Sequence, residues 1–321
     1  MEKFILILGR DIELSLLELT SYLEKENIKY KILDKYQNLV VIELEKIINI
    51  KKLGGLTKIA EVLNNPKQFL DNLMFDKNKI TYTVNDENIR NYLKGKFKQE
   101  RIKAFFKTEI KSLTSSSKLD LELIKFKNYL ARAIQISNPK EYKNRDENRP
   151  YFDAKTVTSI RLAKILINLS KAKHEILDPF CGQGTILQES LLLGLNCYGL
   201  DVNINEAKKN LEWLKTKFNI QNNYKLFQGD ARNLGKYFRK VECCVTEPYL
   251  GPYFKKYPKY NEALNVIKDL EMLYLRVFQE LDRIIEKRVV ILLPIIKTLI
   301  SSNRTRVRIH YRYCSSVGST R

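Results

Sequence analysis

Residues 174–201 read HEILDPFCGQGTILQESLLLGLNCYGLD, and this stretch decides the fold class of the chain. An apolar run leads into a turn that contains two glycines, Gly182 and Gly184, and a helix-forming segment (185–193) follows. A second apolar run then ends on Asp201. This order of strand, glycine turn, helix, strand and acid is typical of one βαβ unit in a nucleotide-binding sheet. The acid lies about 20 residues after the first glycine, as a ribose-binding acid does.

The glycine turn also indicates the class of nucleotide. A dinucleotide fingerprint needs a third glycine, but this chain has Leu187 at that place, and no P-loop pattern G-x-x-x-x-G-K-[ST] occurs. The segment D-P-F-C-G-x-G-T, from Asp178 to Thr185, resembles motif I of the S-adenosylmethionine (SAM) methyltransferases that act on exocyclic amines of nucleic-acid bases. The resemblance implies SAM as the cofactor, with a first group of cofactor-binding residues in this turn: Asp178, Phe180, Gly182, Gly184 and Thr185.

Strand-like and helix-like segments alternate through the second half of the chain, which predicts a doubly wound parallel sheet. The expected strands are 176–177, 197–200, 225–227, 241–245 and 289–293, and the expected helices outside the central unit are 158–169, 205–218 and 262–286. Ligands of such sheets bind at the carboxyl ends of the strands. Four acids follow four successive strands there, namely Asp178, Asp201, Asp230 and Glu247.

These strand ends suggest a division of labour in the site. We expect Asp201 to accept hydrogen bonds from the ribose hydroxyls, Asp230 to accept one from the adenine amine, and Ala231 to pack on the adenine ring. A base amine becomes nucleophilic when acceptors take its N–H bonds, and Glu247 with the carbonyl of Pro248 could supply them. Tyr249 could stack on the extruded base. We therefore expect Glu247, Pro248 and Tyr249 to be the catalytic residues.

The first 147 residues predict a separate α+β region. Its expected elements are strands at 4–8, 30–33, 39–43, 80–84 and 131–136, a helix at 13–25 capped by Asp11, and a basic amphipathic helix over 88–111 that could contact phosphates. The segment 119–126 fits either a helix or a strand. Residues 138–150 (NPKEYKNRDENRP) are charged and lack apolar periodicity, so they predict a linker with the domain boundary inside it.

Composition narrows the class of protein further. The chain has 321 residues, 44% hydrophobic residues and a formal charge of +20, which favours an acidic polymer as partner. Its five cysteines form no C-x-x-C pair and it has two histidines, so we expect no metal site and no disulfide framework. The apolar run at the N-terminus is too short for a signal peptide, and 289–296 is too short for a membrane span. We expect a cytoplasmic protein.

The chain as a whole resembles the THUMP-domain RNA methylases, a group of tRNA guanosine-N2 methyltransferases. The resemblance rests on Ile5–Leu19 (ILILGRDIELSLLEL), Leu53–Val62 (LGGLTKIAEV) and Asn148–Leu169, besides the motifs above. It implies a ferredoxin-like plus THUMP-like RNA-binding region at 1–147 and a Rossmann-like methyltransferase domain at 148–321. It also implies tRNA as substrate and the 2-amino group of a guanine as methyl acceptor.

Two features depart from that family. Its motif IV is usually D-P-P-Y, whereas this chain has Glu247-Pro248-Tyr249-Leu250, with an acid one methylene longer. After Leu293 only 28 residues remain, and none is acidic. This tail fits one edge strand, a basic arm on RNA or an altered terminus, and the sequence does not choose among them.

Two other functions remain open from the sequence. One is an amino-methylase of DNA adenine or cytosine, which shares the motif IV pattern. The other is a tRNA-binding homologue that has lost catalysis, as the altered motif IV suggests. The modified tRNA position and the number of methyl groups also stay open, as does the need for a small activating protein. We expect a monomer.

Overall fold

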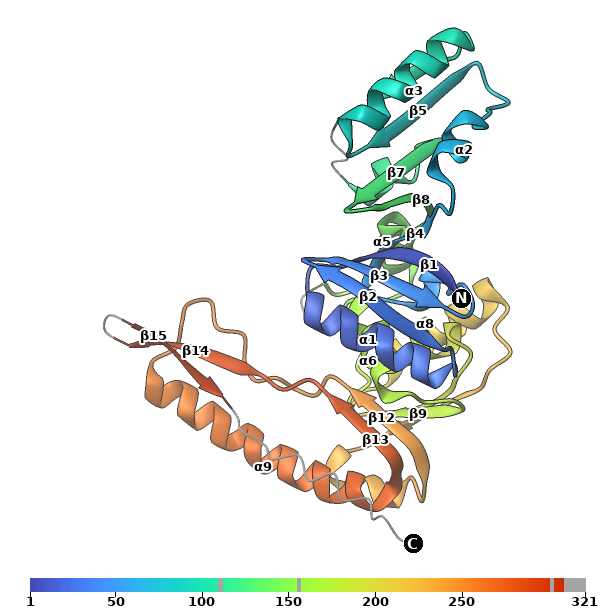
Figure 1. Cartoon of the computed structure of the whole chain (residues 1–321). Coiled ribbons are helices and arrows are strands. Elements are labelled where there is room, and N and C mark those ends of the chain that lie inside the picture. Colours follow the sequence, from blue (N-terminus) through green and yellow to red (C-terminus); the bar gives the residue numbers. More distant parts are fainter. Residues whose placement is uncertain (109–111, 155–156, 301–302, 309–321) are drawn as a thin grey trace, which may run out of the picture.

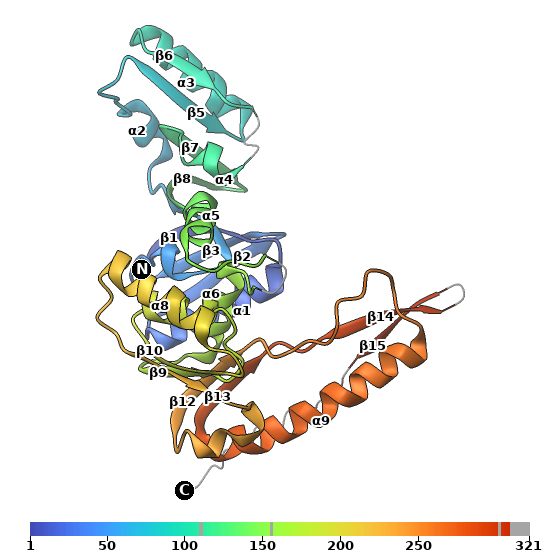
Figure 2. The same ribbon diagram turned by 180° about the vertical axis from the view of Figure 1, so that it is seen from behind.

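The computed structural model describes residues 1–108, 112–154, 157–300 and 303–308. Two sheets organise the molecule, an eight-stranded sheet in the N-terminal half and a five-stranded sheet in the C-terminal half. Figures 1 and 2 show the first sheet standing above the second, with its outer half (β5 to β8) extending away from the rest.

The N-terminal sheet has the order β2-β3-β1-β4-β8-β7-β5-β6. Most neighbours in it are antiparallel, whereas β5 runs parallel to both β6 and β7. Its strands are β1 (Glu2–Leu8), β2 (Tyr30–Tyr36), β3 (Leu39–Leu44), β4 (Leu56–Val62), β5 (Lys79–Val84), β6 (Lys103–Phe106), β7 (Leu121–Phe126) and β8 (Tyr129–Ile136). The segment 119–126, open in the sequence, is therefore a strand.

Short helices cover this sheet: α1 (Ile12–Lys25), η1 (Ile50–Lys52), α2 (Pro66–Asp71), α3 (Glu87–Gln99) and α4 (Leu113–Ser116). Asp11 caps α1 as expected, because its Oδ1 accepts a hydrogen bond from the backbone N of Leu14 at 3.0 Å.

The prediction of a single basic helix over 88–111 is wrong in its second half. Helix α3 ends after Gln99, and Arg101 takes a left-handed conformation with φ 59°. The backbone N of Ile102 then donates to Phe97 O at 2.8 Å, which closes a Schellman motif before the edge strand β6. Glycine usually marks this motif, and an arginine in its place left no signal in the sequence.

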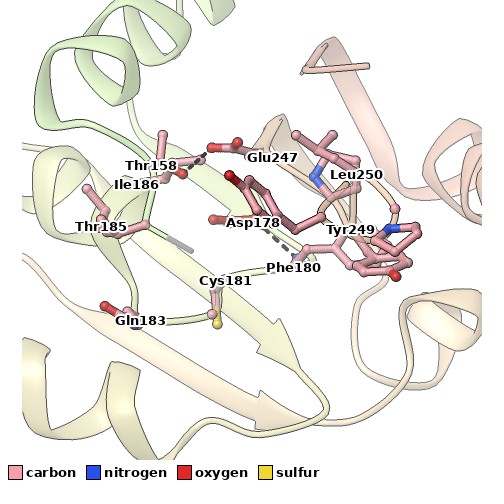
Figure 3. A pocket seen from close by; sticks show the side chains of 16 residues that line it. Thr158, Asp178, Phe180, Cys181, Gln183, Thr185, Ile186, Glu247, Tyr249 and Leu250 are labelled. Atoms are coloured by element: carbon pink, nitrogen blue, oxygen red, sulfur yellow. Dashed lines mark hydrogen bonds between the residues drawn. The ribbon is translucent and has the colours of Figure 1, made fainter. Parts of the chain in front are cut away.

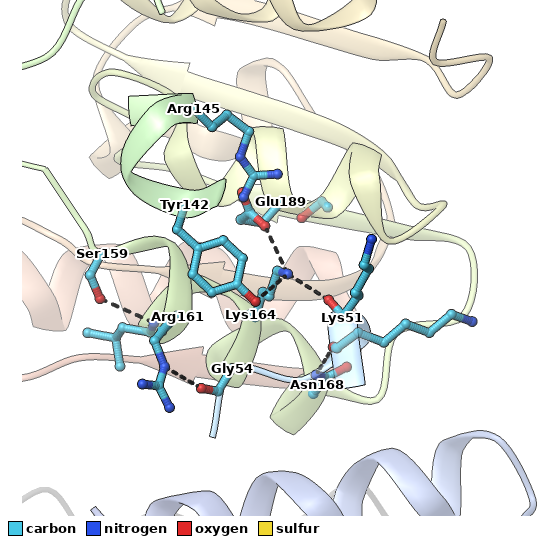
Figure 4. Close-up of polar contacts among 12 residues, drawn as sticks. Lys51, Gly54, Tyr142, Arg145, Ser159, Arg161, Lys164, Asn168 and Glu189 are labelled. Atoms are coloured by element: carbon cyan, nitrogen blue, oxygen red, sulfur yellow. Dashed lines mark hydrogen bonds and ion pairs between the residues drawn. The ribbon is translucent and has the colours of Figure 1, made fainter. Parts of the chain in front are cut away.

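The predicted linker 138–150 is also wrong as a loop, because Pro139–Asn148 form the helix α5. A proline at the first helical position is favourable, since its fixed φ suits a helix start. Polar contacts rather than an apolar face hold the helix: Arg145 Nη2 lies 2.6 Å from Glu189 Oε1, and Tyr142 lies under Lys164 Nζ (Figure 4). Such a helix lacks the apolar periodicity that would have revealed it.

The C-terminal sheet is parallel throughout, with the order β11-β10-β9-β12-β13. Its strands are β9 (Glu175–Asp178), β10 (Asn196–Asp201), β11 (Tyr224–Gln228), β12 (Val241–Thr246) and β13 (Ile285–Ile291). Its helices are α6 (Ile160–Ser170), α7 (Thr185–Leu192), α8 (Asn205–Phe218), η2 (Ala231–Lys236) and α9 (Tyr260–Ile284). The strand order reverses between β9 and β12, and such a switch point opens a crevice beyond the carboxyl ends of the strands. The predicted doubly wound α/β fold is confirmed.

The N-terminal region is joined to α6 by a buried polar contact centred on Glu18 (Figure 4 shows part of this interface). The carboxylate of Glu18 accepts from the backbone N of Gly54 at 2.8 Å and of Gly55 at 2.6 Å, and from Asn168 Nδ2 at 2.8 Å. Burial raises the pKa of Glu18 even though these donors lower it. A Cβ at Gly54 would lie 2.0 Å from the carbonyl oxygen of Arg161, so only glycine allows this close approach.

The tail forms an antiparallel hairpin of β14 (Ile295–Ile300) and β15 (Asn303–Arg308). Ile296 packs with Ala263 and Ile267 of α9, so the hairpin lies beside the first part of that helix, away from the five-stranded sheet (Figure 1). Over the described residues the hairpin makes no strand pairing with the five-stranded sheet, whose edge is β13. The reading of the tail as one edge strand is wrong, and residues 309–321 lie outside the described part.

None of the helices in the described part of the chain combines the length and apolar content that crossing a membrane requires.

Candidate active site

The four acids predicted at strand ends lie along one edge of the parallel sheet. Asp178 and Asp201 are the last residues of β9 and β10, Asp230 follows β11 by two residues, and Glu247 comes directly after β12. Because all these strands are parallel, their carboxyl ends meet at the crevice of the switch point.

The glycine turn brings the first two acids into one unit. The backbone N of Gly184 donates to Cys181 O at 2.6 Å, and both glycines have positive φ, 46° at Gly182 and 80° at Gly184. The backbone N of Gly182 donates to Asp201 Oδ2 at 2.8 Å. A side chain at either glycine would strain the turn. The hydrogen bond from Gly182 to Asp201 holds the turn after β9 against the end of β10.

Asp178 is enclosed beneath this turn, with 2% of its surface exposed. Its Oδ1 accepts from Thr246 Oγ1 at 2.6 Å and from the backbone N of Phe180 at 3.2 Å. Burial, with a smaller contribution from the nearby Asp201 and Glu247, raises the pKa of this carboxyl to about 7, although the two donors oppose the shift. Asp178 therefore ties β9 to β12 at the floor of the site.

A cavity of about 610 Å³, here named the central cavity, lies between the glycine turn and the loop after β12 (Figure 3). Its lining includes Phe180, Gly182, Thr185, Glu247 and Tyr249 among the predicted residues. The lining residues that the sequence analysis did not assign are Val157, Thr158, Cys181, Gln183, Ile186, Leu250, Gly251, Pro252 and Tyr253.

Thr158 is the main residue missed among these. Its Oγ1 donates to Glu247 Oε2 at 2.5 Å (Figure 3), although the two residues are 89 positions apart. The sequence analysis placed Thr158 only as the first residue of the helix expected over 158–169, whereas α6 begins at Ile160 and leaves Thr158 in the preceding loop. The contact fixes one oxygen of the longer acid in motif IV.

A second cavity of about 460 Å³, here named the side cavity, lies beside the first. Its lining includes Asp201, Asp230 and Ala231, and it shares Phe180, Glu247, Pro248 and Tyr249 with the central cavity. The predicted ribose and adenine residues therefore lie on one side of the motif IV loop, and the glycine turn and Thr158 lie on the other.

The carboxylate of Asp230 already has a partner within the chain. Arg232 donates to it through its backbone N and through Nε and Nη2, with Nη2 at 2.5 Å from Oδ2. This hydrogen bonding lowers the pKa of Asp230. A ligand amine would share the carboxylate with Arg232, a residue that the sequence analysis did not assign.

Behind the turn, Arg149 reaches the start of α7. Its side chain is 1% exposed, and its Nη1 donates to Thr185 Oγ1 at 3.0 Å. Burial lowers the pKa of this guanidinium. Arg149 follows helix α5, so it connects the segment between the two sheets to the glycine turn.

In the described residues, no three or more His, Cys, Asp or Glu side chains are grouped as a metal ion would require. Cys181, Cys197, Cys243 and Cys244 are free and buried, and burial raises the pKa of each thiol. A buried neutral thiol is a weak nucleophile. This arrangement does not suit a reaction that needs a cysteine nucleophile.

Two family models match the chain. One described as "RMKL-like, methyltransferase domain" covers residues 148–317, and one described as "DNA methylase" covers residues 23–212. Each match extends over more than half of the chain.

The chain belongs to the RMKL-like methyltransferase family.

Named relatives agree with this family. A tRNA (guanine(10)-N2)-dimethyltransferase of Pyrococcus abyssi is 31% identical over 160 residues, which are 48% of this chain and 44% of that protein. A protein of the same name from Methanothermobacter thermautotrophicus is 28% identical over 272 residues, or 78% of each chain. This methyltransferase thus matches less than half the length of the first relative and more than three quarters of the second.

Among solved structures, TrmN from Thermus thermophilus superposes with a TM-score of 0.52 at 14% identity, covering 91% of this chain and 89% of that one. At this identity the likeness shows the fold alone. The resemblance to THUMP-domain RNA methylases is confirmed, as are the methyltransferase class and SAM as the cofactor of such enzymes.

Proposed function

We propose that this methyltransferase transfers a methyl group from SAM to the exocyclic N2 of a guanosine in tRNA. The observation that carries the proposal is the position of Glu247. Its side chain lines both cavities, and Thr158 holds one of its oxygens. The names of the two relatives support guanosine in tRNA as the acceptor.

The residues that line the two cavities suit the chemical groups of SAM. The side cavity offers the carboxylates of Asp201 and Asp230 to a ribose and an adenine amine, with Ala231 beside the ring. The central cavity offers the glycine turn to the amino-acid end of the cofactor. We assign this end to Asp178, Phe180, Gly182, Gly184 and Thr185, where Asp178 acts through the turn because its Oδ1 already accepts from Thr246 Oγ1 and from the backbone N of Phe180.

When bound, SAM supplies a methyl group on a positively charged sulfur, which leaves as a neutral thioether. The chain's own residues prepare the acceptor. Glu247, with the carbonyl of Pro248, accepts the N–H bonds of the guanine amine and takes up the proton that the nitrogen loses on methylation. Tyr249 stacks on the base, a contact worth about 1–3 kcal/mol. Orienting the amine toward the methyl group supplies much of the rate.

The longer acid in motif IV is compatible with catalysis in this geometry. Glu has one more rotatable bond than Asp, and an unrestrained side chain would lose positioning. Thr158 supplies the restraint by donating to Oε2, so Oε1 is the acceptor that we assign to the guanine amine. This contact favours an active enzyme over the reading of a homologue without catalysis.

We propose further that residues 1–147 bind the tRNA and that residues 148–321 form the methyltransferase domain. We also propose that the protein is a cytoplasmic monomer with tRNA as its partner. Size-exclusion chromatography with light scattering, run with and without tRNA, tests the monomer.

The direct test uses tritium-labelled SAM with the purified protein and unmodified tRNA transcripts. The RNA is digested and the labelled nucleoside is identified. Label in N2-methylguanosine or N2,N2-dimethylguanosine is the expected result, and Glu247→Gln should reduce the rate of labelling by about 100-fold or more. SAM binding without any labelled nucleoside would instead favour a non-catalytic homologue or the need for an activating protein.

A second candidate is methylation of an amine in DNA, favoured by the match of residues 23–212 to the DNA methylase model. Duplex DNA added to the same assay separates the two. Label in DNA adenine or cytosine, with none in tRNA, would replace the proposal.

A further inference from the structure

The segment that follows motif IV has an unusual composition. Residues 249–260 read YLGPYFKKYPKY, with four tyrosines and three lysines in twelve residues. No acid occurs between Glu247 and Glu262. Aromatic residues alternating with cations are typical of surfaces that bind single-stranded nucleic acid.

The structure exposes these side chains instead of packing them. Tyr253 is 90% exposed and Tyr257 is 49% exposed, and Lys255 and Lys256 are exposed as well. Phe254 alone among the aromatic residues of this loop turns inward, where it packs against the cluster of α9 and β14. The loop is thus anchored by one ring while its tyrosines and lysines face outward.

A third cavity, here named the loop cavity, lies between this loop and the start of β14. It has about 580 Å³ and is lined by Tyr253, Phe254, Lys255, Lys256 and Tyr257 on one side and by residues 294–297 on the other. Figures 1 and 2 both show the loop running beside β14 toward the far end of α9.

The loop cavity adjoins the central cavity, because Leu250, Pro252 and Tyr253 line both. A chain with its reacting base at Glu247 would therefore carry its next nucleotide past Tyr253. Tyrosine rings give a stacking surface to any base, and lysines neutralise the phosphate on either side. Between Glu247 and Glu262 the loop itself carries no carboxylate that would repel a phosphate.

We propose that the loop cavity is a second nucleotide site, which takes the unstacked nucleotide adjoining the methylated guanosine. Its base stacks on Tyr257, and its phosphate lies against Lys255 and Lys256. The inference rests on the proposed function, and it assigns a part of the RNA to a segment outside the catalytic residues. It also predicts that the target must lie in an RNA stretch that can unstack at two consecutive nucleotides.

The test measures methylation kinetics of tRNA for Tyr257→Ala and for the double variant Lys255→Ala/Lys256→Ala. Each should raise the KM for tRNA, by about 5- to 150-fold for the tyrosine if stacking contributes its usual 1–3 kcal/mol. Tyr257→Phe should stay close to wild type, because the ring is kept. The Kd for SAM, measured by calorimetry, should not change in any of them.

Matched controls come from the adjoining helix. Tyr260, which is 46% exposed, lies outside the cavity lining, so Tyr260→Ala removes a similar ring. The double variant Lys259→Ala/Lys268→Ala also removes two lysine charges, at positions that do not line the loop cavity. Effects of equal size in variants and controls would overturn the proposal and would leave a non-specific charge or surface effect. Unaltered RNA kinetics in all variants would also overturn it.

Abasic tRNAs test the site with the wild-type protein, so this measurement does not depend on whether a variant folds. Two substrates lack the base 5′ or 3′ of the methylated guanosine. With wild type, one of them should show a raised KM, and Tyr257→Ala should add no further loss on that substrate. Fully additive losses on both substrates would contradict stacking at this site. If the wild-type protein labels no tRNA at all, the proposed function fails first, which separates the two failures.

Discussion

The two ends of the five-stranded sheet each bury a carboxylate, and the two carboxylates have opposite properties. Glu242 lies at the amino end of β12, and Asp178 lies at the carboxyl end of β9. Both are almost fully enclosed, at 5% and 2% exposure. The pKa of Glu242 is lowered to about 2, whereas that of Asp178 is raised to about 7.

The number of donors explains the difference. Burial raises the pKa of both groups, but Glu242 accepts from the backbone N of Lys173, His174 and Glu175 and from Lys287 Nζ, and together these outweigh burial. Asp178 has two donors and faces other acids. A carboxylate that accepts several hydrogen bonds from the chain stabilises the fold. The acids at the opposite end of the sheet accept fewer, so a ligand can still bind to them.

The largest expected effect is at the ligand end. Glu247→Gln keeps the shape but removes the charged acceptor, so kcat should fall about 100- to 10,000-fold, the range of general-base contributions. Initial rates on tRNA at saturating SAM measure it, with Glu262→Gln on the exposed surface of α9 as control. A variant that kept wild-type kcat would exclude Glu247 as the proton acceptor.

Asp201→Ala should weaken SAM binding about 10- to 150-fold, because it removes hydrogen bonds to a charged group worth about 1.5–3 kcal/mol. It also frees the backbone N of Gly182, which loosens the turn. Calorimetry measures the affinity, and Asp282→Asn serves as an exposed control. Binding of tRNA should persist, and its loss in a folded variant would contradict the proposed division between the two regions.

At the structural end, Glu242→Gln should lower the free energy of unfolding by about 1.5–3 kcal/mol at pH 7 and leave the Kd for SAM unchanged. The wild-type carboxylate stabilises the fold above its unfolded pKa of 4.5, and this stabilisation is lost as pH falls toward about 2. Urea unfolding at several pH values measures it. A gap between variant and wild type that does not shrink below pH 4.5 would contradict the charged network.

The smallest effect concerns Asp178→Asn. A raised pKa means that protonated Asp178 favours the fold at low pH and that this contribution is lost as pH rises through about 7. Between pH 6 and pH 8, the free energy of unfolding of the wild type should therefore fall by about 1.4 kcal/mol relative to the Asn variant. The folded state releases its proton midway through this range. Urea midpoints at these two pH values test the sign. A constant difference would mean that Asp178 stays ionised.

Local patterns predicted much of the site end of the sheet. The helix expected at 205–218 is observed as Asn205–Phe218, and the acids at Asp178 and Asp201 end their strands as expected. Each depends on periodicity and turn residues within about 20 positions of chain. The prediction was wrong at α3, which ends after Gln99 with Arg101 in the left-handed position that glycine usually takes, and at α5, where a polar contact to Glu189 holds the helix.

By itself, the sequence determined the glycine turn, the alternation of strands and helices, and the acids at the strand ends, because these follow from backbone conformation and side-chain periodicity of neighbouring residues. Only the tertiary structure decided which groups meet. It brings Thr158 to Glu247 and Gly54 to Glu18 and Arg161, and it places the tail beside α9. Such contacts join residues far apart in the chain, and their geometry depends on how the two sheets and their helices pack.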